Sequence, residues 1–147
     1  MKHMLVLYYC VTIAVLPTST RTQMRAHDTA AAIVIDIQRA DYQGDRPALA
    51  RLHAELAMID VAGNAKLQSR IHYWQGFAMW RRAINGFNVN TDTGELQADI
   101  RVALSAFAAS RAADPNFTDA DVAALGCLQN LMFIYRNDQV RAGEVVQ

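Results

Sequence analysis

The sequence is short of cysteine, proline and lysine. Two cysteines are too few for a disulfide framework or for a zinc site with four thiolate ligands. Lys2 and Lys66 are the only lysines, so arginine carries most of the positive charge. Because 14 basic residues balance 14 acidic ones, no positive surplus exists for sequence-independent binding of nucleic acid, and we expect no nucleic-acid partner. With 52% hydrophobic and 19% charged residues, the 147 residues suit one globular domain.

The sequence also lacks the common motifs of catalysis. It contains no HExxH zinc motif, no glycine-rich phosphate loop and no GxSxG nucleophile motif. Nothing close to Cys127 in sequence supplies a base for a catalytic thiol, and its apolar neighbours favour a buried position. We therefore expect no cofactor, and a protein that is more readily a binding module than an enzyme. A catalytic site assembled in space from distant residues stays open.

The first 20 residues have the pattern of an export signal. Lys2 and His3 precede the apolar run Met4–Leu16, and a short polar stretch follows it. Such a run rises only about 20 Å as a helix, which is less than the hydrocarbon thickness of a membrane, ~30 Å. We therefore predict a signal peptide over residues 1–20, with cleavage no later than residue 26, and a periplasmic or secreted protein without a stable membrane span. The alternatives are a membrane anchor, an internal helix, or translation from Met24 in the cytosol.

The rest of the sequence is typical of an all-α protein. It is rich in alanine, the best helix former, and has no alternating runs of β-branched residues. We predict a helical domain over residues 28–136 and a frayed tail over residues 137–147. Asp28 and Asp92 are candidate N-caps, and Glu95 would complete a capping box with Asp92. About five antiparallel helices in helix-turn-helix pairs are expected, at residues 29–43, 47–60, 65–85, 92–113 and 118–135.

The expected third helix has three different faces at the helical period of about 100° per residue. One apolar stripe consists of Leu67, Ile71, Trp74 and Ala78, and a second consists of Tyr73, Phe77, Trp80 and Ile84. A helix that is apolar on two sides packs against two neighbours, so we expect this helix to be central in a layered array. The third face is partly polar and is expected to be open; it consists of Gln68, His72, Gln75, Met79 and Arg82.

A spaced pattern runs through the third and fourth expected helices. It consists of Trp74-x2-Phe77-Ala78, then Ala103-x3-Phe107, then Asp114-Pro115-Asn116. This pattern resembles the tetratricopeptide repeat, a helix-turn-helix unit of 34 residues with the signature W-x2-L-G-x2-Y, A-x3-F and P. The sequence departs from the family at Arg81, which stands where the family has tyrosine. Ala103 also follows Ala78 by 25 residues where the family has 12, which predicts a longer link between the two helices.

The resemblance implies a right-handed array of helical hairpins, and a small helical bundle without repeat ancestry is the alternative. Members of the family bind a peptide or protein segment along the groove lined by the first helix of each pair. Carried over by register, the groove residues are His72, Gln75, Met79, Arg82 and Asn130. Arg82 suits a carboxylate and Met79 an apolar side chain. We therefore expect an exported interaction or assembly module. The alternatives are a self-associating homodimer without a peptide ligand, an enzyme or a calcium-binding protein.

The calcium alternative comes from a short stretch before the fourth helix. Asn88, Asn90 and Asp92 alternate there, and Asp99 occupies the twelfth position counted from Asn88. This spacing resembles a calcium loop, in which alternating oxygen ligands surround the cation. However, the glycine, Gly94, is one place late, and two of the ligands are amides. An asparagine-rich turn before a capped helix explains the same residues, so we expect no metal.

Overall fold

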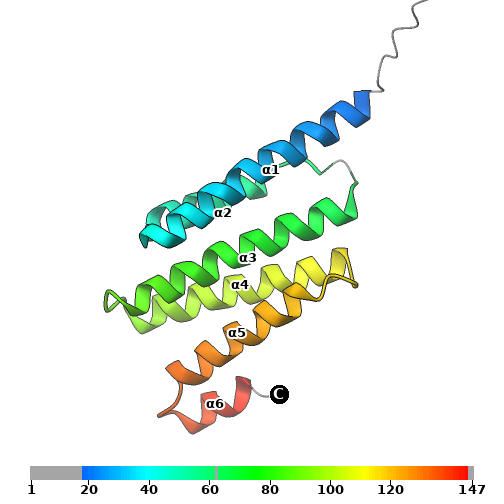
Figure 1. Ribbon diagram of the computed structural model, residues 1–147. Helices are drawn as coiled ribbons and strands as arrows, with labels where there is room; N and C mark the ends of the chain where they lie inside the picture. Colours follow the sequence, from blue (N-terminus) through cyan, green and yellow to red (C-terminus); the bar gives the residue numbers. More distant parts are fainter. Residues whose placement is uncertain (1–17, 62, 146–147) are drawn as a thin grey trace, which may run out of the picture.

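The computed structural model describes residues 18–61 and 63–145, and within these ranges all regular structure is helical, which confirms the all-α class (Figure 1). Most of the expected export signal, residues 1–17, lies outside the described residues. None of the described helices is long and apolar enough to cross a membrane. The helices are α1 (Thr18–Gln43), α2 (Arg46–Ala57), α3 (Ala65–Phe87), α4 (Thr93–Ala113), α5 (Asp119–Ile134) and α6 (Gln139–Val145).

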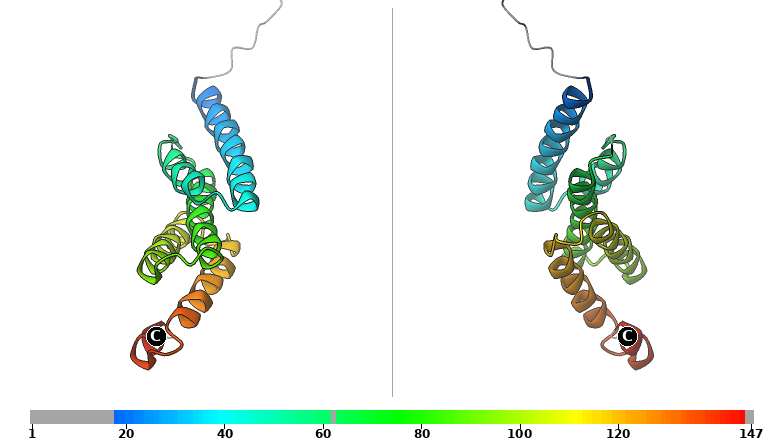
Figure 2. Two further views of the ribbon diagram at one scale, coloured as in Figure 1. Left: turned by 90° about the vertical axis from the view of Figure 1, so that its left-hand side faces the viewer. Right: turned by 90° about the vertical axis from the view of Figure 1, so that its right-hand side faces the viewer.

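The helices lie in successive layers, with α1 and α2 at one end, α3 and α4 in the middle, and α5 and α6 at the other end (Figure 1). The central position expected for the third helix is confirmed, because α3 contacts α1, α2, α4 and α5. Figure 2 shows that α1 and α5 lie to one side of α3, while α2 and α4 lie to the other. The helices α1, α3 and α5 therefore form one face of the molecule.

Two apolar cores lie on either side of α3. The first joins α1, α2 and α3 and contains Ile37, Leu49, Leu56 and Ile71 among its buried residues. The second joins α3, α4 and α5 and contains Ala83, Ile100, Phe107 and Cys127 among its buried residues. The two apolar stripes expected on the third helix supply residues to both cores, which accounts for its position between its neighbours.

Short polar side chains fix the starts of α2, α3 and α4. The side chain of Asp45 accepts a hydrogen bond from the backbone N–H of Ala48 at 3.0 Å, and Asn64 caps α3 in the same way. Asp92 caps α4 by accepting from the N–H of Gly94 at 2.9 Å, as expected. Only half of the expected capping box forms: the N–H of Glu95 donates to Asp92 at 3.3 Å, whereas the carboxylate of Glu95 pairs with arginine side chains of other helices.

Two expected boundaries differ from the structure. The first helix begins at Thr18, so Asp28 lies inside it and caps nothing. It extends in this direction because its buried stripe begins at Ala26, ahead of the expected start. Within the expected tail, residues 139–145 form α6, whose Ala142 and Val145 pack on the second core.

The long link expected between the third and fourth helices is wrong as well. The extra residues between Ala78 and Ala103 lengthen α3 and α4 themselves, and only residues 88–92 connect them. Asn90 adopts a left-handed conformation in this turn, with φ of 53°. Asparagine tolerates this conformation better than most residues, which explains the asparagine-rich sequence of the turn.

Candidate functional site

Most of the polar face of α3 is covered, contrary to the expectation from the sequence, and of its five residues only Gln68 is exposed. Gln75 and Met79 are each only 8% exposed. Nδ1 of His53 on α2 lies 3.1 Å from the backbone oxygen of Gln75, and Nδ1 of His72 lies 2.9 Å from the Gln75 side-chain oxygen. Met79 belongs to the second core. This face of α3 therefore packs against its neighbours, and its polar groups bond to one another.

Arg82 belongs to an ion cluster that consists of Arg46 on α2, Arg82 on α3, and Glu95 and Asp99 on α4. Nη2 of Arg46 and Nη2 of Arg82 lie 2.8 Å and 2.6 Å from Oε1 of Glu95. Arg82 also pairs with Asp99, and Oδ2 of Asp99 lies 3.5 Å from Nη2 of Arg46. Arg82 therefore already pairs with two carboxylates of its own chain, Glu95 and Asp99. The ion cluster joins α2, α3 and α4.

Burial dominates the electrostatics of this ion cluster. Asp99 is 3% exposed, and its burial raises the pKa of its carboxyl above the ordinary value, although Arg82 and Arg46 both act to lower it. The carboxylate is thus held by two arginines at a site where charge is poorly solvated. The cost of taking these charges out of water offsets much of their mutual attraction, so the ion cluster adds little net stability.

Asn130 has a role of its own. Its side-chain oxygen accepts a hydrogen bond from Nε1 of Trp80 at 2.8 Å, which ties α5 to α3. The five residues expected to line one groove thus divide among the His72–Gln75 pair, the second core, the ion cluster and this hydrogen bond. The sequence identified the polar residues of α3 and α5 but not their partners.

The four candidate calcium ligands do not act together. Asp92 caps α4, while Asp99 lies within α4 and belongs to the ion cluster. Asn90 holds the left-handed position of the turn. Within the part of the chain that the structure describes, no group of three or more His, Cys, Asp or Glu side chains could hold a metal ion.

A hollow of about 670 Å³ lies between the N-terminal halves of α1 and α3, and we call it the α1–α3 hollow. Its walls are mainly apolar, and its polar residues lie at one end. It is lined by His27, Ala30, Ala31, Val34, Ile35, Leu56, Asn64, Lys66, Leu67, Arg70, Ile71 and Trp74. Its size is within the range of pockets that hold small molecules or parts of peptides.

The aromatic side chain in the wall of the hollow is braced from behind. The ring centroid of Trp74 lies 5.0 Å from that of Phe77 and 5.5 Å from that of Tyr73, both in edge-to-face geometry. Burial, with a contribution from Asp119, raises the pKa of Tyr73, so this phenol stays neutral at ordinary pH. The indole therefore presents a fixed apolar surface to the hollow.

The polar end of the hollow is positively charged. Lys66 and Arg70 lie one turn apart on α3, and both are exposed. The guanidinium of Arg70 lies 3.4 Å from the centre of the Phe117 ring, with Asp114 3.9 Å away, so its position is fixed. None of the described residues that line the hollow is acidic. An occupant with negative charge near this end would meet the exposed ammonium group of Lys66, whereas the guanidinium of Arg70 already lies against Phe117 and Asp114.

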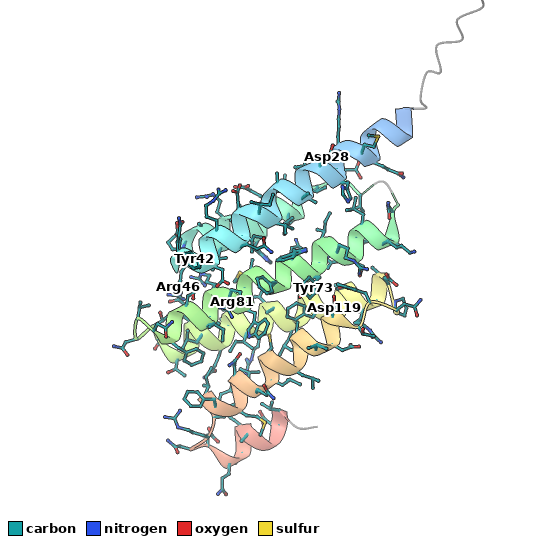
Figure 3. The ribbon with its side chains drawn as sticks, viewed as in Figure 1. Asp28, Tyr42, Arg46, Tyr73, Arg81 and Asp119 are labelled. Carbon is teal, nitrogen blue, oxygen red and sulfur yellow. The ribbon has the colours of Figure 1, made fainter. Side chains whose placement is uncertain are left out.

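The hollow exists because α1 is attached to α3 mainly at the other end. There Nε of Arg81 lies 2.8 Å from Oδ1 of Asp41, and Nδ2 of Asn85 donates to the same carboxylate oxygen at 3.2 Å. Figure 3 shows Arg81 on α3 close to the C-terminal part of α1, and Tyr73 farther along α3. Toward its N-terminus, α1 carries Ala30 and Ala31, which are too small to fill the space beside Trp74.

The hollow does not follow from the sequence alone, although the sequence contains one signal of it. Besides its buried stripe, α1 carries Ala31, Val34 and Ile35, and Ile35 is 55% exposed. A helix that packs on one side only normally carries polar residues on its remaining faces. The surplus marks a second apolar surface, but only the packing of α3 shows what that surface borders.

Cys127 lies in neither the ion cluster nor the lining of the α1–α3 hollow. It is fully buried in the second core, and burial raises the pKa of its thiol to about 12.

Comparison of the chain with protein-family models, with curated proteins and with solved structures finds no match.

Proposed function

We propose that the protein is an interaction or assembly module that holds a peptide or protein segment in the α1–α3 hollow. The observation that carries the proposal is the hollow itself: an apolar trough with a braced tryptophan, open to solvent between two helices. Helical grooves of this kind bind partner segments through apolar anchors at regular spacing. The sequence resemblance to tetratricopeptide repeats supports the same use, since α1 and α3 are the first helices of their pairs.

The positive charge at the polar end of the hollow indicates the chemical class of the proposed ligand. Apolar side chains of the segment would lie against Ile71 and Trp74, and a carboxylate would lie close to Lys66 and Arg70. We therefore propose an amphipathic, acidic segment as the ligand. Lys66 suits this role because its ammonium group is an exposed point charge on a flexible side chain.

The experiment begins with peptides selected from a random displayed library by the whole chain, and their affinities are measured by calorimetry. Ala31→Trp places a large ring in the hollow and should weaken binding at least tenfold. Ala54→Trp adds the same ring on an exposed position of α2, outside the hollow, and should change the affinity less than twofold. Equal affinities of the two variants for every selected peptide would exclude the hollow as the binding site.

A second measurement tests the charge preference. The selected peptides should be richer in Asp and Glu than the library, and Lys66→Glu should weaken their binding about tenfold. Lys66→Gln should have a smaller effect, because it removes attraction without adding repulsion. Peptides without acidic enrichment, bound equally well by both variants, would contradict the proposed ligand chemistry and leave the hollow itself in place.

We further propose that the protein acts outside the cytoplasm, in the periplasm or beyond the cell. The support is the pattern at the N-terminus, where Lys2 and His3 precede the apolar run Met4–Leu16. Expression of the whole chain in a bacterial host, followed by fractionation and N-terminal sequencing, should give a periplasmic protein that begins between residues 21 and 27. A cytoplasmic product that keeps Met1 would refute export.

A further inference from the structure

The outer surface of α5 is unusually apolar for a helix that faces solvent. Val122 is 69% exposed, Leu125 60% and Met132 45%. Between Val122 and Ile134 the only polar residues of the helix are Gln129 and Asn130. A helix that is apolar on nearly all sides is normally buried on nearly all sides. The buried face of α5 accounts for one side only.

These exposed side chains form one continuous stripe. At about 100° per residue, Val122, Leu125, Gln129 and Met132 fall along one line of the helix, which we call the α5 stripe. The buried residues Ala120, Ala123, Cys127 and Leu131 fall on the opposite side and face the second core. The α5 stripe therefore points away from α3 and α4, and its occupation would leave the α1–α3 hollow open.

Opposite charges lie at the two ends of the α5 stripe. Asp121 lies in the first turn of α5, and Arg136 follows the end of the helix. Asp121 pairs with Arg111 and its side chain is still 51% exposed. The guanidinium of Arg136 lies 4.4 Å from the centre of the Phe133 ring and donates a hydrogen bond to the backbone oxygen of Phe133 at 3.1 Å. The acidic end and the basic end are thus both accessible from solvent.

The arrangement is self-complementary. Asp121 and Arg136 are equally distant in sequence from a point between Leu128 and Gln129, and so are Leu125 and Met132. When two copies of α5 pack antiparallel about a two-fold axis at that point, each Asp121 faces Arg136 of the second copy. Leu125 then faces Met132 of the second copy. An interface of this kind needs one surface that matches itself, which is the requirement for a two-fold dimer.

We propose that the α5 stripe is a homodimer interface, in which two copies of the chain pair through antiparallel α5 helices. A partner of another kind would require only one apolar patch and one charge on this chain. Along the α5 stripe, however, Asp121 is matched by Arg136 and Leu125 by Met132, which is the pattern that a second copy requires. The exposed side of α4 offers a contrast, because Val102 there lies beside Arg101 and is the only large exposed apolar residue of that helix.

Sedimentation of the whole chain over a hundredfold concentration range tests the proposal. The mass should rise from 16.3 kDa toward twice that value as concentration increases. Leu125→Asp should give a monomer throughout with unchanged circular dichroism, and Val102→Asp, the matched change on α4, should keep the dimer. A wild-type chain that stays monomeric, or two variants with the same mass, would overturn the proposal.

Charge reversal tests the register of the dimer. Asp121→Arg places two arginines together, and Arg136→Asp places two carboxylates together, so each single variant should weaken dimerisation about tenfold. The double variant restores opposite charges across the interface and should recover the wild-type dissociation constant within about threefold. A double variant no better than the weaker single variant would exclude this antiparallel register. Both results are independent of peptide binding in the hollow.

Discussion

The two sides of α3 differ in how closely the neighbouring helix approaches. Toward α4 the backbones nearly touch: a Cβ atom added at Gly76 would lie 2.7 Å from the ring of Phe107 and 3.0 Å from the backbone oxygen of Ala103. Ser69 and Ser110 are fully buried there and their hydroxyl oxygens lie 3.1 Å apart. Toward α1 the same helix borders a hollow of about 670 Å³. One helix thus lies between the two cores and also forms a wall of the α1–α3 hollow.

The comparison shows that alanine has two opposite consequences in this chain. Ala103 of α4 lies opposite Gly76 of α3, with Phe107 of its own helix filling the space beside it, so its small size brings α3 and α4 together. Ala30 and Ala31 are not matched in this way, and their small size leaves space beside Trp74. Small residues produce close packing only where larger ones fill the volume next to them.

The largest expected effect comes from removing a buried side chain on the side of α3 that faces α4, which we call the tight side. Phe107→Ala should lower the free energy of unfolding by about 3–5 kcal/mol, because its ring is 1% exposed and α3 and α4 cannot close the cavity. Trp74→Ala should cost less than half as much although the side chain is larger, because Trp74 already borders solvent. Urea denaturation of both variants gives the two values. Equal losses would mean that the two sides of α3 are equally well packed.

Overfilling the tight side should have the next largest effect. Gly76→Ala should lower the free energy of unfolding by about 1–3 kcal/mol, because the methyl group meets Phe107 and the α4 backbone. Gly143→Ala is the matched control, since a Cβ atom at this helical position in α6 meets nothing within 4 Å. The control should be neutral or raise stability by about 0.5–1 kcal/mol. A Gly76→Ala variant that melts with or above the wild type would refute the close approach.

On the side of α3 that faces α1, which we call the loose side, the fold should tolerate a larger side chain. Ala31→Leu places three more carbon atoms in the α1–α3 hollow and should raise the free energy of unfolding by about 0.5–1 kcal/mol. The same change should weaken binding of the selected peptides, so stability and binding move in opposite directions. Thermal melting and calorimetry on one preparation measure both. A loss of stability as large as that of Gly76→Ala would show that the hollow is already filled by side chains.

The smallest expected effect is a dependence on pH that comes from the ion cluster. Because burial raises the pKa of Asp99, the folded chain binds this proton more tightly than the unfolded chain does. Its contribution to stability is therefore complete below the ordinary carboxyl pKa and is lost as pH rises through the raised value. Relative to Asp99→Asn, the wild type should lose stability as the pH rises from acidic to neutral. A relative gain over that range would mean that the arginines outweigh burial.

The sequence predicted the all-α class and the central position of α3, because both follow from periodicity within single segments. It also located most helix ends, through local signals such as Asp92 before α4. It did not predict which face of α3 stays open. Arg82 and Gln75 look like surface residues in sequence, and only the arrival of Glu95, Asp99 and His53 from other helices buries their polar groups. Contacts between distant segments leave no periodic trace.

The ion pair between Arg81 and Asp41 joins α1 to α3 near one end of α1, and this gives the helix the geometry of a lever. His27 lies 14 residues before Asp41, which is about 21 Å along a helix. Rotation of α1 by about 10° around the ion pair would shift His27 by about 4 Å at that rise per residue, with little displacement at Asp41. In such a rotation the width of the hollow at its mouth would therefore change more than the distance between Arg81 and Asp41.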